Sequence, residues 1–452
     1  MITVKTVKIL KTCNLYLCAL LTGMCMAITG PTLLDLQNIV GTDTKHIAFV
    51  YTARSAGYLF GSIFGGVLFD MTNKKQLIFT IFNFINAAST FAIPWSRVIG
   101  ALTGFMTVNG FTMGLLDTGT NVCCLYLWGK ESGPYYQALH FVYGVGGLIS
   151  PLIAAPFLTT HHLEGIVNNV TNNNNVTHLE TQAQINSSVH TVPLPPITYA
   201  YTIVGGVGLL VTASFLVMCI ASPLDDNGQK EENNQTRSSA IGFVTLIVSL
   251  NFLLLFVETG TEIGFAQMVA IYSVKGPLQL TKTVGSYITS TFWGSFTIFR
   301  FVSVFLAIKL SNRTMVIFDI ILTSVGAAIL QCLAADYEWA LWLASALLGA
   351  GVASLFPSAI AWVDQYITVT NKMVSLFAVG AAFGEMMVPY TISYFINEVP
   401  AVLIYVVIAS CVLSGAIVIL MFLVLRNRPE KYLTKEEIST QRGTEDSNNK
   451  RF

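Results

Sequence analysis

The chain has 452 residues, of which 53% are hydrophobic and 11% are charged, whereas a typical soluble domain carries about 25% charged residues. This composition excludes an ordinary soluble protein and indicates an integral membrane protein. The formal net charge is zero, so electrostatics give no reason to expect a nucleic-acid partner. The sequence shows no P-loop, glycine-rich dinucleotide turn or nucleophile elbow, and we therefore expect neither ATP-driven pumping, nor an enzyme, nor a bound cofactor or metal.

Twelve apolar runs are long enough to cross a bilayer, which takes about 20 mostly apolar residues. They lie at about 12–34, 47–69, 76–95, 98–122, 134–158, 197–220, 241–271, 284–308, 314–335, 339–363, 373–396 and 400–425. A charged segment divides them into six and six. The sequence thus predicts an all-α membrane protein with a first half at 1–221, a linker at 222–239, a second half at 240–425 and a tail at 426–452.

Lys and Arg between the runs set the orientation, because cytoplasmic loops carry an excess of both. With the N-terminus inside, 18 of the 24 Lys and Arg residues fall in inside segments and five at the outside. Both termini are therefore predicted to be cytoplasmic. The outside segment 159–196 then holds three glycosylation acceptors, Asn169, Asn175 and Asn186, which indicates a glycoprotein of the secretory pathway, most simply in the plasma membrane.

The segment between the second and third runs carries Asp70 at a helix end, followed by Lys74 and Lys75. An acid and two cations at this spacing can lock a cytoplasmic gate, so the three are candidate gating residues. An ordinary positively charged cytoplasmic loop is the alternative.

The fourth run contains one charged residue, Asp117, between Val98 and Trp128. A carboxylate at such depth is costly and usually marks an ion or substrate path. Asn121 is four residues further and shares its helix face. In the fifth run, Gln137 is a further candidate for the same site.

The seventh run carries Glu258 and Glu262, again four apart. Glu258 lies deeper, and we expect it to be a second functional acid, whereas Glu262 either contributes to the site or meets water near the outer helix end. In the eighth run, Trp293 and Arg300 recur on one stripe. The Trp293 ring is a candidate for stacking on a sugar, although a single tryptophan more often packs against a neighbouring helix. Arg300 is expected to form a structural or gating pair with Asp319.

Glu385 in the eleventh run stands four residues before Pro389, which frees a backbone carbonyl. Gly147 and Pro151 have the same spacing in the fifth run, a weak internal repeat. The membrane region holds more acids than bases, which favours attraction of a cation, whether sodium or a proton.

Three stretches together resemble one family: residues 30–36 (GPTLLDL), residues 54–62 (RSAGYLFGS), and residues 116–121 (LDTGTN) followed by Trp128-Gly129. They are similar to the sodium-dependent glucose transporter 1 subfamily of the major facilitator superfamily. Residues 66–75 also resemble the superfamily's cytoplasmic loop motif, Gly-x-x-x-Asp-Arg-x-Gly-Arg-Arg, from which Met71 and Asn73 depart.

The resemblance implies the major facilitator fold, twelve transmembrane helices in two six-helix halves that are parallel repeats around a midplane site. Distantly similar fucose–proton symporters carry Leu-Glu-Thr-x-x-Asn in the fourth helix, which implies a coupling or sugar-binding role for Asp117. Their acid in the first helix has no counterpart here, where residues 27–31 read AITGP.

The sequence thus predicts a secondary active transporter of a neutral hexose such as glucose, working by alternating access and coupled to sodium. The expected partners are the sugar, a coupling cation (sodium or a proton) and the lipid bilayer. The substrate-binding candidates are Asp117, Asn121, Glu258, Glu262, Gln137, Trp293 and Glu385; Asp117 and Glu258 are the ion-coupling candidates. An uncoupled facilitator, a carrier of another small polar solute and a non-transporting membrane sensor remain as alternatives, and the oligomeric state is left open.

Overall fold

The structure is a computed structural model that describes residues 4–128, 132–159, 194–221, 241–367, 369, 371–426 and 428. Its regular elements within these ranges are all helical. The three glycosylation acceptors, the linker and most of the tail lie outside the described residues.

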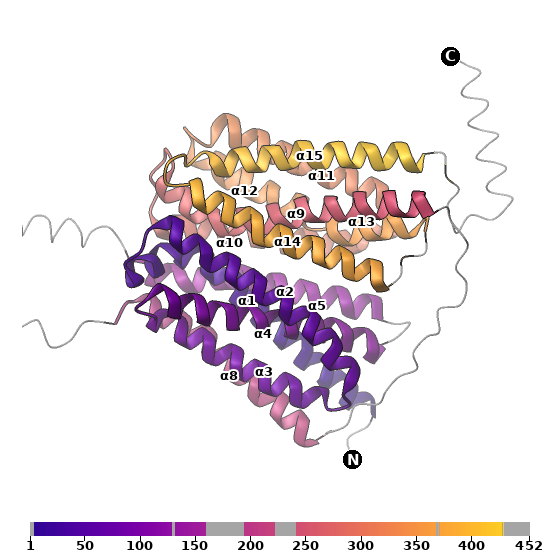
Figure 1. Cartoon of the computed structure of the whole chain (residues 1–452), viewed down its shortest axis with the longest axis horizontal. Helices are drawn as coiled ribbons and strands as arrows, with labels where there is room; N and C mark the ends of the chain where they lie inside the picture. The colour runs from indigo at the N-terminus through magenta and orange to yellow at the C-terminus, as the bar shows by residue number, and fades with distance from the viewer. Residues whose placement is uncertain are drawn as a thin grey trace, which may run out of the picture.

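The first half of the chain forms six long helices, which lie side by side in the lower part of Figure 1. They are α1 (Val4–Val40), α2 (Thr44–Met71), α3 (Lys75–Ala92), α4 (Ile99–Trp128), α5 (Ser132–Ala154) and α8 (Ile197–Ala221). The short 3-10 turns η1 (Ile93–Trp95) and η3 (Ala155–Phe157) extend α3 and α5.

The second half lies against the first, in the upper part of Figure 1. Its helices are α9 (Ile241–Lys275), α10 (Lys282–Lys309), α11 (Asn312–Leu333), α12 (Glu338–Val352), α13 (Leu355–Asp364), α14 (Asn371–Phe395) and α15 (Val402–Leu425). The prediction of an all-α membrane fold is confirmed.

Eleven segments of the described part are long and apolar enough to span a membrane, with α12 and α13 together making one of them. The helix α2 is 28 residues long but is not among the eleven. It carries Arg54, Ser55 and Tyr58, which turn toward other helices rather than lipid. A polar helix of this kind is stable in a membrane when neighbouring helices cover its polar face.

The predicted run 339–363 is broken between α12 and α13 at Ala353 and Ser354. Pro357 explains the break, because proline has no N–H and its ring clashes with the carbonyl four residues earlier, here that of Ala353. The chain resumes as a helix when the Ser358 N–H bonds to the Ser354 carbonyl at 3.1 Å.

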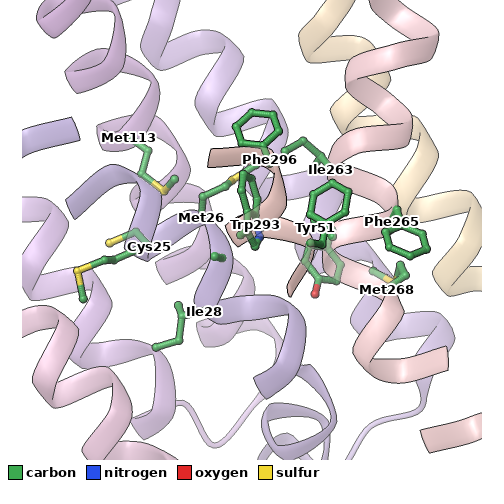
Figure 2. Packing of buried hydrophobic residues seen from close by; sticks show 14 of the residues in the cluster. Cys25, Met26, Ile28, Tyr51, Met113, Ile263, Phe265, Met268, Trp293 and Phe296 are labelled. Carbon is green, nitrogen blue, oxygen red and sulfur yellow. The ribbon is translucent and has the colours of Figure 1, made fainter. Parts of the chain in front are cut away.

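The two halves meet through close helix contacts that depend on glycine. A Cβ atom on Gly144 of α5 would lie 2.4 Å from the Thr297 hydroxyl of α10, and one on Gly147 would lie 2.8 Å from the Trp293 ring. Figure 2 shows Trp293 and Phe296 of α10 beside Met26 of α1. One apolar core therefore crosses both halves, and small residues allow the approach.

At one end of the bundle a buried ion pair also joins the halves. Lys282, the first residue of α10, donates to the Asp35 carboxylate of α1 at 2.6 Å, with side-chain exposures of 9% and 3%. Thr159 donates to the same carboxylate and accepts from Lys282. The charge distribution of the sequence predicts that this is the outer end.

Candidate functional site

Asp117 is held beside α2 by the close packing of α2 on α4. A Cβ atom on Gly114 would lie 2.0 Å from the Tyr58 carbonyl oxygen, so only glycine permits this approach. The same contact brings the Tyr58 hydroxyl to the carboxylate, to which it donates a hydrogen bond of 2.8 Å. This hydrogen bond fixes the orientation of the Asp117 side chain.

The second half contributes a cation and an acid opposite Asp117. Arg300 of α10 interacts electrostatically with both Asp117 and Glu262 of α9, and its guanidinium lies 4.8 Å from the Phe296 ring centroid. Asp117, Glu262 and Arg300 are all partly exposed.

Glu385 joins the same group from α14. Its carboxylate interacts electrostatically with Glu262, Arg54 and Asp117. The backbone carbonyl of Glu385 has no N–H partner within its helix, because Pro389 has no N–H. The Ser55 hydroxyl of α2 donates a hydrogen bond of 3.3 Å to this carbonyl instead. The proline spacing noted in the sequence thus creates a contact between the two halves.

Arg54 of α2 supplies a second positive charge that acts on Glu385. It is 2% exposed and donates to the Thr29 hydroxyl at 2.9 Å. Its guanidinium also lies 3.2 Å from the Met26 sulfur. Arg54 acts on Glu385 through space, and no acid forms an ion pair with it within the described ranges.

Aromatic side chains from α5 and α10 border the charged residues. Tyr143 interacts electrostatically with Glu385, Glu262 and Asp117, and its ring packs edge-on against Trp293 with centroids 6.2 Å apart. We call Tyr58, Asp117, Tyr143, Glu262, Arg300 and Glu385 the interhalf cluster. They come from six helices, three in each half.

The interhalf cluster combines carboxylate acceptors, phenol hydroxyls and a guanidinium donor at the contact between two halves. Such groups match a neutral ligand rich in hydroxyls, since each hydroxyl both donates and accepts. Its three acids outnumber Arg300 and Arg54, so an anionic ligand is disfavoured.

The remaining substrate-binding candidates divide between this cluster and other places. Asn121 follows Asp117 by one turn, and its buried amide oxygen has no hydrogen-bond partner within the described ranges. Gln137 is partly exposed on α5. Trp293 is 1% exposed, and its Nε1 has no hydrogen-bond partner within the described ranges. Its ring is covered by Gly147, Tyr143, Phe292 and Phe296. The ring face that was expected to stack on a sugar is therefore not free in this structure.

Glu258 does not belong to the interhalf cluster. It interacts electrostatically with Glu262, but its other neighbours are Ser414 of α15 and Asp319 of α11, both inside the second half. Glu262 is also not near a helix end, because α9 continues for more than three turns to Lys275. Of the two glutamates, Glu262 is the one that interacts with Arg300, as Asp117 also does.

The expected pair between Arg300 and Asp319 is wrong. Asp319 accepts a 2.6 Å hydrogen bond from Ser354, whereas Arg300 interacts electrostatically with Glu262 and Asp117. The physical reason is that α10 and α11 present different faces to the interior, so nearness of the two residues along the chain does not bring their side chains together.

The predicted gating residues do not form a lock in this conformation. Asp70 is exposed, and within the part of the chain that the structure describes it has no ion pair with Lys74 or Lys75. Lys75 is 5% exposed and lies 3.8 Å from the Tyr126 ring centroid of α4. It therefore serves helix packing by a cation–π contact.

Sequence reasoning missed Tyr58, Tyr143 and the ion pair of Asp35 and Lys282. Tyr58 and Asp35 do lie inside the stretches that carry the family resemblance. No spacing rule connects Asp35 to Lys282, which are 247 residues apart.

Comparisons with known proteins show the family to which this chain belongs. A sequence profile described as Major Facilitator Superfamily matches residues 244–446. The chain is 30% identical over 401 residues to sodium-dependent glucose transporter 1 of Xenopus laevis, covering 88% of this chain and 79% of that protein. The chain belongs to the major facilitator superfamily.

Other members of the superfamily extend the comparison. The human sodium-dependent glucose transporter 1 is 28% identical over 405 residues, which cover 87% of this chain and 75% of the human protein. A crystal structure of the nucleoside transporter NupG superposes with a TM-score of 0.62 at 13% identity, covering 93% of this chain and all of that one. The protein is thus a multi-pass membrane transporter with the major facilitator fold.

Proposed function

We propose that this protein is a secondary active transporter that moves a neutral hexose such as glucose across the plasma membrane by alternating access, coupled to sodium. The observation that carries the proposal is the interhalf cluster, in which Tyr58 orients Asp117, and Asp117 interacts electrostatically with Arg300 and Glu385 of the second half. The names of the relatives, sodium-dependent glucose transporters, support the sugar and the ion.

In this proposal the two halves share the recognition of one sugar. Asp117 accepts hydroxyl hydrogen bonds, the unpartnered Asn121 amide oxygen adds an acceptor, and Arg300 donates from the second half. A ligand held by both halves binds tightly only where they converge, and it therefore couples its own binding to the relative motion of the halves.

The ion pair between Asp35 and Lys282 supports alternating access. It closes the predicted outer end by joining α1 to α10, while Asp70 at the predicted inner end is exposed. With both termini in the cytoplasm, this ion pair would hold the outer ends of the two halves together. Glycans on Asn169, Asn175 and Asn186 would then lie outside the cell.

Uptake into vesicles that contain the purified protein tests the proposal. Labelled glucose is supplied with an inward sodium gradient, an inward proton gradient or neither, for the wild type and Asp117→Asn. Asp336→Asn is the matched control, because Asp336 is exposed at the end of α11. Concentrative uptake with sodium alone, kept in the control and lost in Asp117→Asn, is the expected result.

The other results assign different functions. Concentrative uptake with the proton gradient would replace sodium by a proton, and equal non-concentrative uptake in all conditions would make the protein a facilitator. No glucose uptake under any condition would refute the hexose proposal, in favour of another polar solute or a sensor.

A further inference from the structure

A groove that faces the membrane lies where α5, α10 and α12 come together. It has a volume of about 560 Å³, which is within the range of about 300–1,000 Å³ that small-molecule sites occupy. Leu152 of α5 and Ile298 of α10 border it and are 43% and 60% exposed. All three helices belong to membrane-spanning segments, so these exposed apolar side chains meet lipid and the groove opens toward the bilayer.

One face of α10 forms the floor of the groove. Its bordering residues run from Tyr287 to Phe299 at alternating spacings of three and one, which places them on a single stripe of the helix. At a rise of about 1.5 Å per residue, the stripe is about 18 Å long. Half of the hydrocarbon core measures about 15 Å. The groove therefore has the length of one leaflet and suits a single lipid.

A buried hydroxyl on this floor has no partner. Ser290 borders the groove and is 4% exposed, and its hydroxyl makes no hydrogen bond within the described ranges. The neighbouring hydroxyls differ, because Thr291 donates to the Tyr287 carbonyl at 3.0 Å and Ser295 donates to the Ala346 carbonyl of α12 at 2.6 Å. Buried polar groups normally have a partner, so the Ser290 hydroxyl indicates a ligand that brings an acceptor into the groove.

The first turn of α12 brings an acid and an indole to the groove. Trp342 borders the groove, and its Nε1 donates to the carboxylate of Glu338, the first residue of α12, at 3.1 Å. Glu338 is exposed, and no Lys or Arg borders the groove in the described part of the chain. A carboxylate beside an aromatic ring matches a quaternary ammonium group, whereas it repels an anionic head group.

The groove continues into the contact between the two halves. Gly294 borders the groove, and a Cβ atom on it would lie 3.1 Å from the Leu148 side chain of α5. The adjacent residues Gly147 and Trp293 form the close contact between α5 and α10 described above. A lipid in the groove would therefore touch α5 of the first half together with α10 and α12 of the second.

We propose that this groove binds one choline phospholipid of the outer leaflet. The quaternary ammonium lies against the Trp342 ring and the Glu338 carboxylate, and the Ser290 hydroxyl donates to an ester carbonyl of the lipid. An acyl chain then lies along the α10 stripe toward Phe299. A lipid seated in this way holds α5 against α10 and stabilises the contact between the halves. The proposal does not depend on which solute the protein transports.

Native mass spectrometry of the purified full chain tests the site. The protein in detergent is titrated with phosphatidylcholine or with phosphatidylglycerol of identical acyl chains. We expect one phosphatidylcholine per chain, bound about tenfold more tightly than phosphatidylglycerol. Thr291→Trp fills the groove and should lose this binding. Thr391→Trp is the matched control, because Thr391 lies exposed on α14 and, like Thr291, donates to the carbonyl four residues earlier.

Two milder variants test the assigned contacts and decide if Thr291→Trp does not fold. Glu338→Gln should lose the preference for phosphatidylcholine, whereas Asp336→Asn, which removes an exposed acid two residues earlier, should keep it. Ser290→Ala should weaken phosphatidylcholine binding several-fold, because it removes one hydrogen bond. Equal binding of both lipids by the wild type, or a preference unchanged in Glu338→Gln and Ser290→Ala, would overturn the proposal. A sterol bound in place of the phospholipid and lost in Thr291→Trp would also overturn it.

Discussion

Replacing Lys282 with methionine should open the predicted outer end of the transporter. Lys282 and Asp35 join α10 to α1 at 2.6 Å and are almost fully buried. Thr159 contacts both side chains. Without Lys282, the buried Asp35 carboxylate keeps its hydrogen bonds from Thr159 but has no cation beside it. Separation of α1 from α10 at this end would expose the carboxylate to water, so the open conformation should become more favourable.

The expected size follows from measured costs of breaking buried ion pairs. Removing one partner costs about 3–5 kcal/mol, and each 1.4 kcal/mol is about a factor of ten in an equilibrium constant. The ratio of outer-closed to outer-open molecules should therefore fall by about two to three and a half orders of magnitude. The value should lie near the lower limit, because Thr159 still donates to Asp35.

Hydrogen–deuterium exchange of the last turn of α1 and the first turn of α10 measures the opening. Exchange should accelerate at both places in Lys282→Met and less in the double variant Asp35→Asn/Lys282→Met, which leaves no unpaired charge. Lys275→Met is the matched control, since Lys275 bonds to Asn397 within the second half. Two results would refute the reasoning. One is an unchanged exchange rate in Lys282→Met, and the other is a free energy of opening in the double variant that equals the sum of the changes in the two single variants.

Three further predictions concern the site, the packing and the tail. Tyr58→Phe should weaken sugar binding several-fold with folding intact, because it removes the 2.8 Å bond to Asp117, and an unchanged apparent affinity in the uptake assay would contradict that role. Gly114→Ala should lower the Tm, since the new Cβ would lie 2.0 Å from a backbone oxygen, while Gly100→Ala, with open space around it, should not; equal Tm values would show that α2 and α4 do not depend on this contact. Deletion of residues 428–452 should leave uptake intact, whereas a sensor that signals through its tail would lose its signal.

Much of the fold follows from simple rules that the sequence obeys. Most of the twelve runs agree with the helices to within a few residues, because hydrocarbon forces every backbone group to bond within its own helix. The exceptions have causes visible in the structure: Pro357 divides one run, and α1 and α4 extend beyond their apolar parts.

The site was only partly predictable. Asp117 and Glu385 were found because a carboxylate stands out in an apolar run, and both lie in the interhalf cluster. The sequence favoured Glu258 over Glu262 as a site residue, whereas the interhalf cluster contains Glu262 and not Glu258. Four residues along a helix rise about 6 Å and turn about 40° beyond a full circle, which is enough for Glu258 to meet α15 while Glu262 meets the first half.

The sequence by itself determined the membrane class, the number and approximate limits of the spanning runs, the predicted orientation and the few polar residues that matter, because each is a property of local composition. Only the tertiary structure decided which of those residues meet. Asp117 interacts with Arg300, and Asp35 pairs with Lys282, because these neighbourhoods depend on how the helices of one half pack on those of the other. That packing rests on contacts between residues far apart in the chain, which no local pattern records.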